Sequence, residues 1–339
     1  MIDRRAVLGG VGAMAAMSGL PGAAFAARLR KPPRLRLGDT VGLVAPASAL
    51  TLPDELDRAR YWIQAMGLVP KLGTHVTEQD GYLAGSDAAR AADLNAMFAD
   101  PEVRAIFAVR GGWGGARVLE LLDWSAIRAH PKLLLGYSDT TALHLAIAAR
   151  GGFPTIHGPN AASRWEKASW ESLWRLAFTG EMPTLGGEAM EQEVGRPGRT
   201  ITSGIARGRL LGGNLTILST LMGTPWLPDF SGAVLFLEDV NEAEYRIDRM
   251  LQQLKLAGVL DGLAGAIFGQ CTRCTGDEGD TVGFTLDQII DHHLKPLGIP
   301  AFTGANIGHI TNQLCLPSGV QVELNADART LRVLEPLVD

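Results

Sequence analysis

Between residues 37 and 180, short runs of apolar residues alternate with amphipathic segments. Short runs that are apolar throughout are typical of strands buried on both faces, and the amphipathic segments are typical of helices. The predicted strands are residues 41–45, 105–109 and 133–135, and the predicted helices are residues 53–66, 87–98, 115–122 and 140–149. Strands that alternate with helices predict a parallel sheet covered on both sides. We therefore expect a Rossmann-like α/β domain over residues 35–180.

The pattern changes after residue 180. Residues 181–207 are rich in glycine, proline, glutamate and threonine and lose hydrophobic periodicity, which predicts a linker. Beyond it we expect helices at residues 215–222 and 246–256, strands at 233–237 and 266–269, and a hairpin of residues 320–324 and 331–334. The prediction is a smaller α/β domain with an antiparallel component, residues 208–337.

The first 26 residues have the features of an export signal. Arg4 and Arg5 precede a glycine- and alanine-rich apolar stretch that ends near Leu20. Ala24-Phe25-Ala26 then gives the small-x-small pattern of a cleavage site. The stretch is too short for a comfortable membrane span, and the paired arginines resemble a twin-arginine signal. We expect a periplasmic protein whose only membrane contact is through this signal; an ordinary export signal or an uncleaved anchor remains the alternative.

Composition and charge narrow the class of protein. The chain has 339 residues, 46% of them hydrophobic, which is enough for two domains with separate cores. The net charge of −5 argues against a nucleic-acid-binding protein, which would show a basic face.

Three cysteines leave one question open. Cys271 and Cys274 have the spacing of a redox or half-zinc site, and Cys315 stands alone. A zinc site would need two more ligands, and His292 and His293 lie on an ordinary helical pattern. The pair would form a small disulfide loop in an oxidising compartment. We favour a surface turn with incidental cysteines.

A serine follows the third predicted strand. Ser138 comes two residues after Gly136 and directly before a predicted helix, whose first N–H groups are free. This arrangement suits a nucleophile beside an oxyanion hole. A helix cap is the alternative, and judged alone the pattern favours the cap. The second glycine of the α/β-hydrolase elbow is absent, because Thr140 stands in its place.

A glycine-rich loop, residues 110–115, follows the second of these strands. It lacks the lysine-serine pair of a P-loop and the spacing of a dinucleotide-binding motif. Glycines let backbone amides approach an anion closely, so we interpret this loop as anion-stabilising, with the Gly112 N–H as one donor. A structural turn is the alternative.

Two further residues complete a candidate site. Glu238 ends an apolar strand, where a carboxylate faces a cleft more often than a core. His309 follows Gly308, which we expect to let the ring swing into open space. His157 has a similar setting and is a rival base. In the order Ser138, Glu238, His309 these residues match a nucleophile–acid–base arrangement.

Together these segments resemble a known family. The resemblance is to the LD-carboxypeptidases (muramoyltetrapeptide carboxypeptidases), which include microcin C self-immunity peptidases, and it spans residues 35–337. It is carried by residues 42–48, 110–115, 136–139, 211–215, 237–240, 245–249 and 308–309.

The resemblance implies a serine carboxypeptidase that cleaves terminal D-Ala from a murein tetrapeptide. It implies Ser138 as nucleophile, His309 as base and Glu238 as the residue that orients it, with the amides of Asp139 and Gly112 as the oxyanion hole. It also implies a homodimer and no metal, and we expect no cofactor. An export signal departs from the best-known cytoplasmic members. A related peptidase acting on peptide-antibiotic conjugates and a periplasmic solute-binding protein remain as alternatives.

Overall fold

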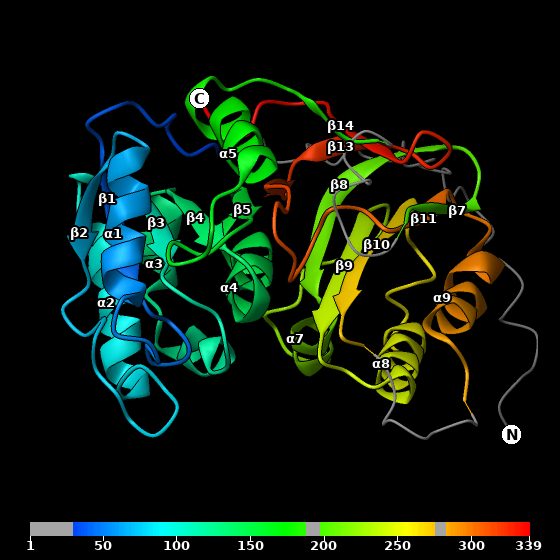
Figure 1. The fold of residues 1–339 in the computed structure, drawn as a ribbon, viewed down its shortest axis with the longest axis horizontal. Coiled ribbons are helices and arrows are strands. Elements are labelled where there is room, and N and C mark those ends of the chain that lie inside the picture. Colours follow the sequence, from blue (N-terminus) through cyan, green and yellow to red (C-terminus); the bar gives the residue numbers. More distant parts are fainter. Residues whose placement is uncertain (1–29, 188–196, 275–282) are drawn as a thin grey trace, which may run out of the picture.

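The computed structural model describes residues 30–187, 197–274 and 283–339, and these residues build two sheets that lie side by side (Figure 1). The predicted export signal, residues 1–26, lies outside the described residues. Among the described residues, no helix is long and apolar enough to cross a bilayer.

The first sheet has six strands in the order β12-β5-β4-β3-β1-β2. All are parallel except β12, which runs antiparallel to β5. The strands are β1 (Thr40–Val44), β2 (Val69–Leu72), β3 (Val103–Ala108), β4 (Leu133–Gly136), β5 (Thr155–His157) and β12 (Leu316–Ser318). The helical segments are α1 (Glu55–Ala65), α2 (Asp87–Ala99), η1 (Gly115–Leu121), α3 (Trp124–Ala129), η2 (Ser138–Thr140), α4 (Thr141–Ala146), η3 (Ile147–Gly151), α5 (Lys167–Leu173) and η4 (Trp174–Phe178).

Helices cover both faces of this sheet, as expected. Leu43 of β1 belongs to the core cluster that contains Ile63 of α1. Val44, the next residue, belongs to the cluster that contains Leu94 of α2, because successive side chains of a strand point to opposite faces. A Cβ on Gly42 would lie 2.7 Å from the sulfur of Met97, so this glycine lets α2 pack close against β1.

The second sheet has eight strands in the order β6-β14-β13-β8-β9-β10-β11-β7. Its centre, β8 to β11, is parallel, and the remaining pairs are antiparallel. The strands are β6 (Thr184–Gly186), β7 (Arg199–Thr202), β8 (Ile205–Asn214), β9 (Val234–Val240), β10 (Gly265–Thr272), β11 (Ala301–Thr303), β13 (Gln321–Asn325) and β14 (Thr330–Val333). The helical segments are α7 (Leu215–Thr220), α8 (Glu244–Leu256), α9 (Leu286–Leu294) and η5 (Lys295–Leu297). The fold class, a parallel α/β sheet followed by α/β with an antiparallel component, is confirmed.

The boundary between the two sheets along the chain differs from the one that the sequence pattern predicts. Residues 181–207, predicted as a linker, contain β6, β7 and the start of β8. Strand β12 lies within residues 208–337, yet it pairs with β5 in the first sheet. Strands of three or four residues are too short to show a period of two, which is why the pattern missed them.

Two predicted helices also differ in detail. Residues 115–122, predicted as a helix, form the 3₁₀ segment η1, and residues 140–149 divide between η2, α4 and the π-turn η3. The division places a tight 3₁₀ turn directly at Ser138.

Candidate active site

Ser138 lies on a strained turn between β4 and α4. Its φ of 62° falls in the left-handed region, which costs a residue other than glycine about 1–3 kcal/mol. Gly136 makes the turn possible, because a Cβ there would lie 2.8 Å from Thr140 Oγ1 and 2.9 Å from Asn160 Oδ1. Strain of this kind holds a side chain in one place and is typical of nucleophile turns. The helix-cap interpretation is wrong, because Ser138 is the first residue of η2, and the cap positions of η2 and α4 are held by Tyr137 and Thr140.

The glycine loop after β3 runs past Ser138. A Cβ on Gly111 would lie 3.0 Å from Ser138 Oγ and 3.3 Å from the backbone nitrogen of Asp139. Gly112 adopts a φ of 102°, and a Cβ there would lie 2.2 Å from Ser48 Oγ. Both positions therefore require glycine, and the loop brings backbone beside the nucleophile and the first N–H of the following turn.

The Asp139 side chain fastens this loop to the serine turn. Its carboxylate accepts a hydrogen bond of 2.5 Å from the backbone N–H of Gly115. The residue is buried, and burial raises its pKa to about 6. Sequence reasoning considered only the Asp139 amide and missed this role, because nothing in the chain around Ser138 identifies Gly115 as its partner.

Glu238 and His309 form the second half of the site. Glu238, near the end of β9, has no exposed surface, and its Oε2 lies 2.8 Å from His309 Nδ1. Since a carboxylate accepts hydrogen bonds, this contact places the proton on Nδ1 and leaves Nε2 free to accept one. The arrangement suits a general base held in one orientation.

Gly308 makes the contact possible in a way that differs from our expectation. A Cβ at this position would lie 2.7 Å from Glu238 Oε2 and 2.8 Å from Glu238 Cβ, and the φ of Gly308 is 111°. The glycine thus gives the carboxylate room beside the backbone; it does not serve to let the histidine ring swing into open space.

Ser138 and His309 line one cavity of about 360 Å³, together with Gly111 and Gly112. Tyr137 also lines the cavity, with its ring 4.8 Å from the His309 ring, centroid to centroid. The other residues that line the cavity are Glu55, Val109, Arg110, Asn160, Ala162, Ser163 and Val240. The cavity therefore joins the nucleophile, the glycine loop and the histidine, although these come from different sheets.

His157, the rival base, is excluded by its position. It has no exposed surface and packs against Phe236 and Tyr137, with ring centroids 5.1 Å and 6.2 Å away. Burial holds its pKa well below the ordinary range, so it stays neutral. It does not line the cavity.

Comparison with known proteins identifies the family. The LD-carboxypeptidase N-terminal domain matches residues 41–158, and the LD-carboxypeptidase C-terminal domain matches residues 207–324. The chain belongs to the LD-carboxypeptidase family of serine peptidases.

Individual relatives and a solved structure of this family match most of the chain. The "Probable murein peptide carboxypeptidase" of Bacillus subtilis is 37% identical over 88% of this chain and 93% of its own length. The murein tetrapeptide carboxypeptidase of Pseudomonas aeruginosa is 33% identical over 82% of this chain and 91% of its own. The solved structure of the self-immunity protein MccF in complex with glutamyl sulfamoyl guanosine is 26% identical, with a TM-score of 0.80, over 91% of this chain and 99% of that one. Family membership speaks against the solute-binding alternative.

In this LD-carboxypeptidase hydrogen bonds outside the cavity lining join the two halves of the site. The Thr141 hydroxyl, on the helix that follows Ser138, accepts a hydrogen bond of 3.0 Å from the backbone N–H of Asn214. The Asn214 side chain in turn donates to Asp239 at 3.0 Å, and Asp239 follows Glu238 on β9. Sequence reasoning missed this connection, because Thr141, Asn214 and Asp239 are far apart in the chain.

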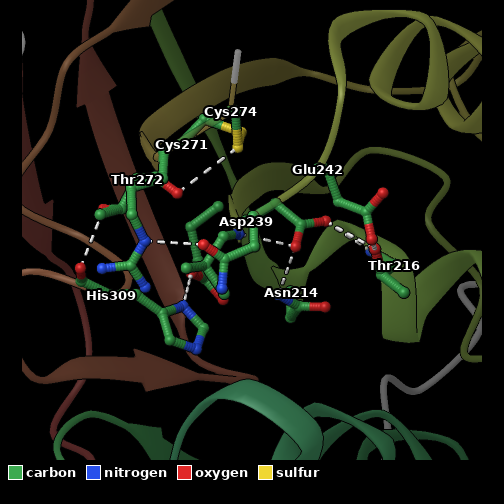
Figure 2. The surroundings of a disulfide bond; sticks show 12 residues. Asn214, Thr216, Asp239, Glu242, Cys271, Thr272, Cys274 and His309 are labelled. Atoms are coloured by element: carbon green, nitrogen blue, oxygen red, sulfur yellow. Dashed lines mark hydrogen bonds and ion pairs between the residues drawn. A yellow bond between two sulfur atoms is a disulfide. The ribbon is translucent and has the colours of Figure 1, made fainter. Parts of the chain in front are cut away.

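Cys271 and Cys274 are joined in a disulfide at the end of β10, so our preference for incidental cysteines is wrong. Figure 2 shows that Thr272, within the loop they close, contacts His309. The hydroxyl of Thr272 donates a hydrogen bond of 2.8 Å to the backbone carbonyl of His309, and the Thr272 carbonyl accepts one of 2.9 Å from Asn241 N. The disulfide thus stabilises the loop that supports the histidine. Cys315 is free and buried.

No cluster of three or more histidine, cysteine or carboxylate side chains suited to a metal occurs in the parts of the chain that the structure describes.

Replacing Gly308 with alanine should reduce kcat roughly a hundredfold, because the new Cβ would displace Glu238 or His309 and misplaced catalytic groups lose about that much. Steady-state kinetics on a murein peptide would measure it. Gly298→Ala is the matched control: Gly298 also has a positive φ, 65°, but nothing lies within 4 Å of its added Cβ. Equal losses in both variants would contradict the steric explanation.

Asp239→Asn should change how stability depends on pH. Burial, and then the charge of Glu238, raise the pKa of Asp239 to about 6 from an ordinary 3.8. The folded protein therefore binds this proton more tightly than the unfolded one, so the stability of the native protein falls as pH rises from about 4 to 6.

The asparagine variant lacks this contribution. Relative to it, the native protein should lose about 3 kcal/mol of unfolding free energy between pH 3.5 and 7. Urea unfolding of both proteins at several pH values would show the effect, and a constant difference would refute it.

Proposed function

We propose that this protein is a serine LD-carboxypeptidase that hydrolyses the bond between an L-centre diamino acid and terminal D-Ala in murein tetrapeptides. The observation that carries the proposal is the cavity in which Ser138 and the Glu238-oriented His309 meet the glycine loop. Relatives named for murein peptide cleavage at 37% and 33% identity support the substrate.

The chemistry follows from the geometry. His309 Nε2 takes the Ser138 proton as Oγ attacks the carbonyl carbon, and the amides of Gly112 and Asp139 donate to the developing oxyanion. His309 then gives the proton to the departing D-Ala amine, leaving an acyl-enzyme. Water, deprotonated by His309, hydrolyses the ester and returns the serine hydroxyl. Glu238 stabilises the imidazolium during each transfer.

Release of D-Ala from purified murein tetrapeptide tests the function. Ser138→Ala should reduce the rate by on the order of a thousandfold or more, because no other group takes over the attack. Ser125→Ala, a serine-to-alanine change on the exposed side of α3, serves as control. Equal rates in wild type and Ser138→Ala would refute Ser138 as nucleophile.

A specific observation also favours a second candidate, cleavage of peptide-antibiotic conjugates. The structure of MccF with glutamyl sulfamoyl guanosine bound has the same fold at 26% identity. If the folded wild-type protein released no D-Ala but cleaved an aminoacyl sulfamoyl nucleoside, the second candidate would replace the first.

We also propose that the mature protein works in the periplasm after export through the twin-arginine route. Arg4 and Arg5 support this, and the Cys271–Cys274 disulfide suits an oxidising compartment. Changing both arginines to lysine should leave the protein in the cytoplasm, with the thiols of Cys271 and Cys274 open to alkylation. The native chain should be in the periplasm, where the disulfide protects both cysteines from alkylation. Native chain in the cytoplasm would refute the proposal.

Light scattering of the purified protein would test the homodimer that the family resemblance implies.

A further inference from the structure

A carboxypeptidase must recognise the free carboxylate at the end of its substrate. The terminal carboxylate belongs to the residue directly after the scissile bond, and neighbouring Cα atoms are about 3.8 Å apart. The group that binds the carboxylate must therefore line the same cavity as Ser138. Three side chains that bear or acquire charge line it, namely Glu55, Arg110 and His309. Among the cavity-lining residues that the structure describes, Arg110 is the one with a permanent positive charge.

We propose that Arg110 binds the terminal α-carboxylate of the substrate. The inference rests on the proposed function and deepens it, since it assigns the group that makes the enzyme act at a chain end. Arg110 directly precedes Gly111, whose backbone lies beside Ser138, so the position of Arg110 is tied to that of the nucleophile.

The contacts of Arg110 leave one side of its guanidinium available. Nη1 donates to the Thr51 hydroxyl at 2.7 Å and to the Ala49 carbonyl at 3.0 Å. Within the described parts of the chain, Nε and Nη2 donate no hydrogen bond. These two N–H groups lie on one edge of the planar guanidinium, which is an edge that carboxylates bind with two parallel hydrogen bonds.

Glu55 forms an ion pair with the other side of the guanidinium. Its oxygens lie 3.4 Å from Arg110 Nη1, so the pair involves Nη1 and leaves the edge formed by Nε and Nη2 open to a second anion. Glu55 Oε2 also accepts hydrogen bonds from the backbone N–H groups of Thr51, at 2.6 Å, and Leu52, at 3.2 Å. Its role is to hold the loop against which Nη1 rests, so that Arg110 is fixed on one side and open on the other.

The test compares two substrates that differ only at the terminus: a lysine-containing murein tetrapeptide with a free D-Ala carboxylate, and the same peptide with a C-terminal amide. Wild type should prefer the acid by on the order of a hundredfold in kcat/KM, as expected for a desolvated charge pair. Arg110→Gln should bring the ratio close to one, mainly through a higher KM for the acid. Arg110→Lys should give an intermediate ratio, since lysine keeps the positive charge but lacks the paired N–H groups of the guanidinium.

The matched control is an arginine outside the cavity. Arg60→Gln makes the same change on the exposed side of α1, so it should keep the wild-type preference for the acid. If Arg110→Gln fails to fold, the ratio in Arg110→Lys decides.

Three outcomes separate the possibilities. A wild type that cleaves neither these two peptides nor the diaminopimelate-containing tetrapeptide would refute the proposed function itself. Cleavage of acid and amide at equal rates, or an unchanged ratio in Arg110→Gln, would overturn the inference and leave the function standing. If Arg110→Gln instead lost only a preference for a diaminopimelate-containing peptide over the lysine-containing one, Arg110 would bind the side-chain carboxylate, and the inference would also be overturned.

Discussion

The site depends on a carboxylate that has been removed from water. Glu238 has no exposed surface, and a buried carboxylate costs several kcal/mol unless a polar partner compensates it. His309 provides that partner at 2.8 Å. The surrounding residues maintain this contact. Gly308 leaves space for the carboxylate, and the Thr272 hydroxyl donates a hydrogen bond to the His309 carbonyl. The interaction that fixes the histidine tautomer is thus also a condition for the local fold.

The opposite side of the cavity is organised by backbone geometry. Ser138 occupies a left-handed conformation that the surrounding loop enforces, and Asp139 anchors that loop through Gly115. The two sides come from different sheets and meet through the Thr141–Asn214 hydrogen bond, close to the nucleophile.

The long elements and the triad candidates could be predicted from the sequence because their signals are local. An apolar run such as residues 105–109 predicts a buried strand without knowledge of its neighbours, and Ser138, Glu238 and His309 each follow such a run or a glycine. The Asp139–Gly115 contact and the role of Gly308 could not be predicted, because each depends on which distant residue lies opposite. Strand β12 was missed for the same reason: three residues gain their strand character only from pairing with β5.

Strand β12 also has a consequence for the order in which the molecule is made. Residues 316–318 complete a sheet whose other strands lie within residues 40–157, so this sheet cannot close until nearly the whole chain has left the ribosome. Until then β5 has an unpaired edge, which is the kind of surface that promotes aggregation. Pairing over so long a separation is also slow to form. The two sheets, though distinct in space, are thus a single unit in folding, and neither half of the gene encodes a finished domain.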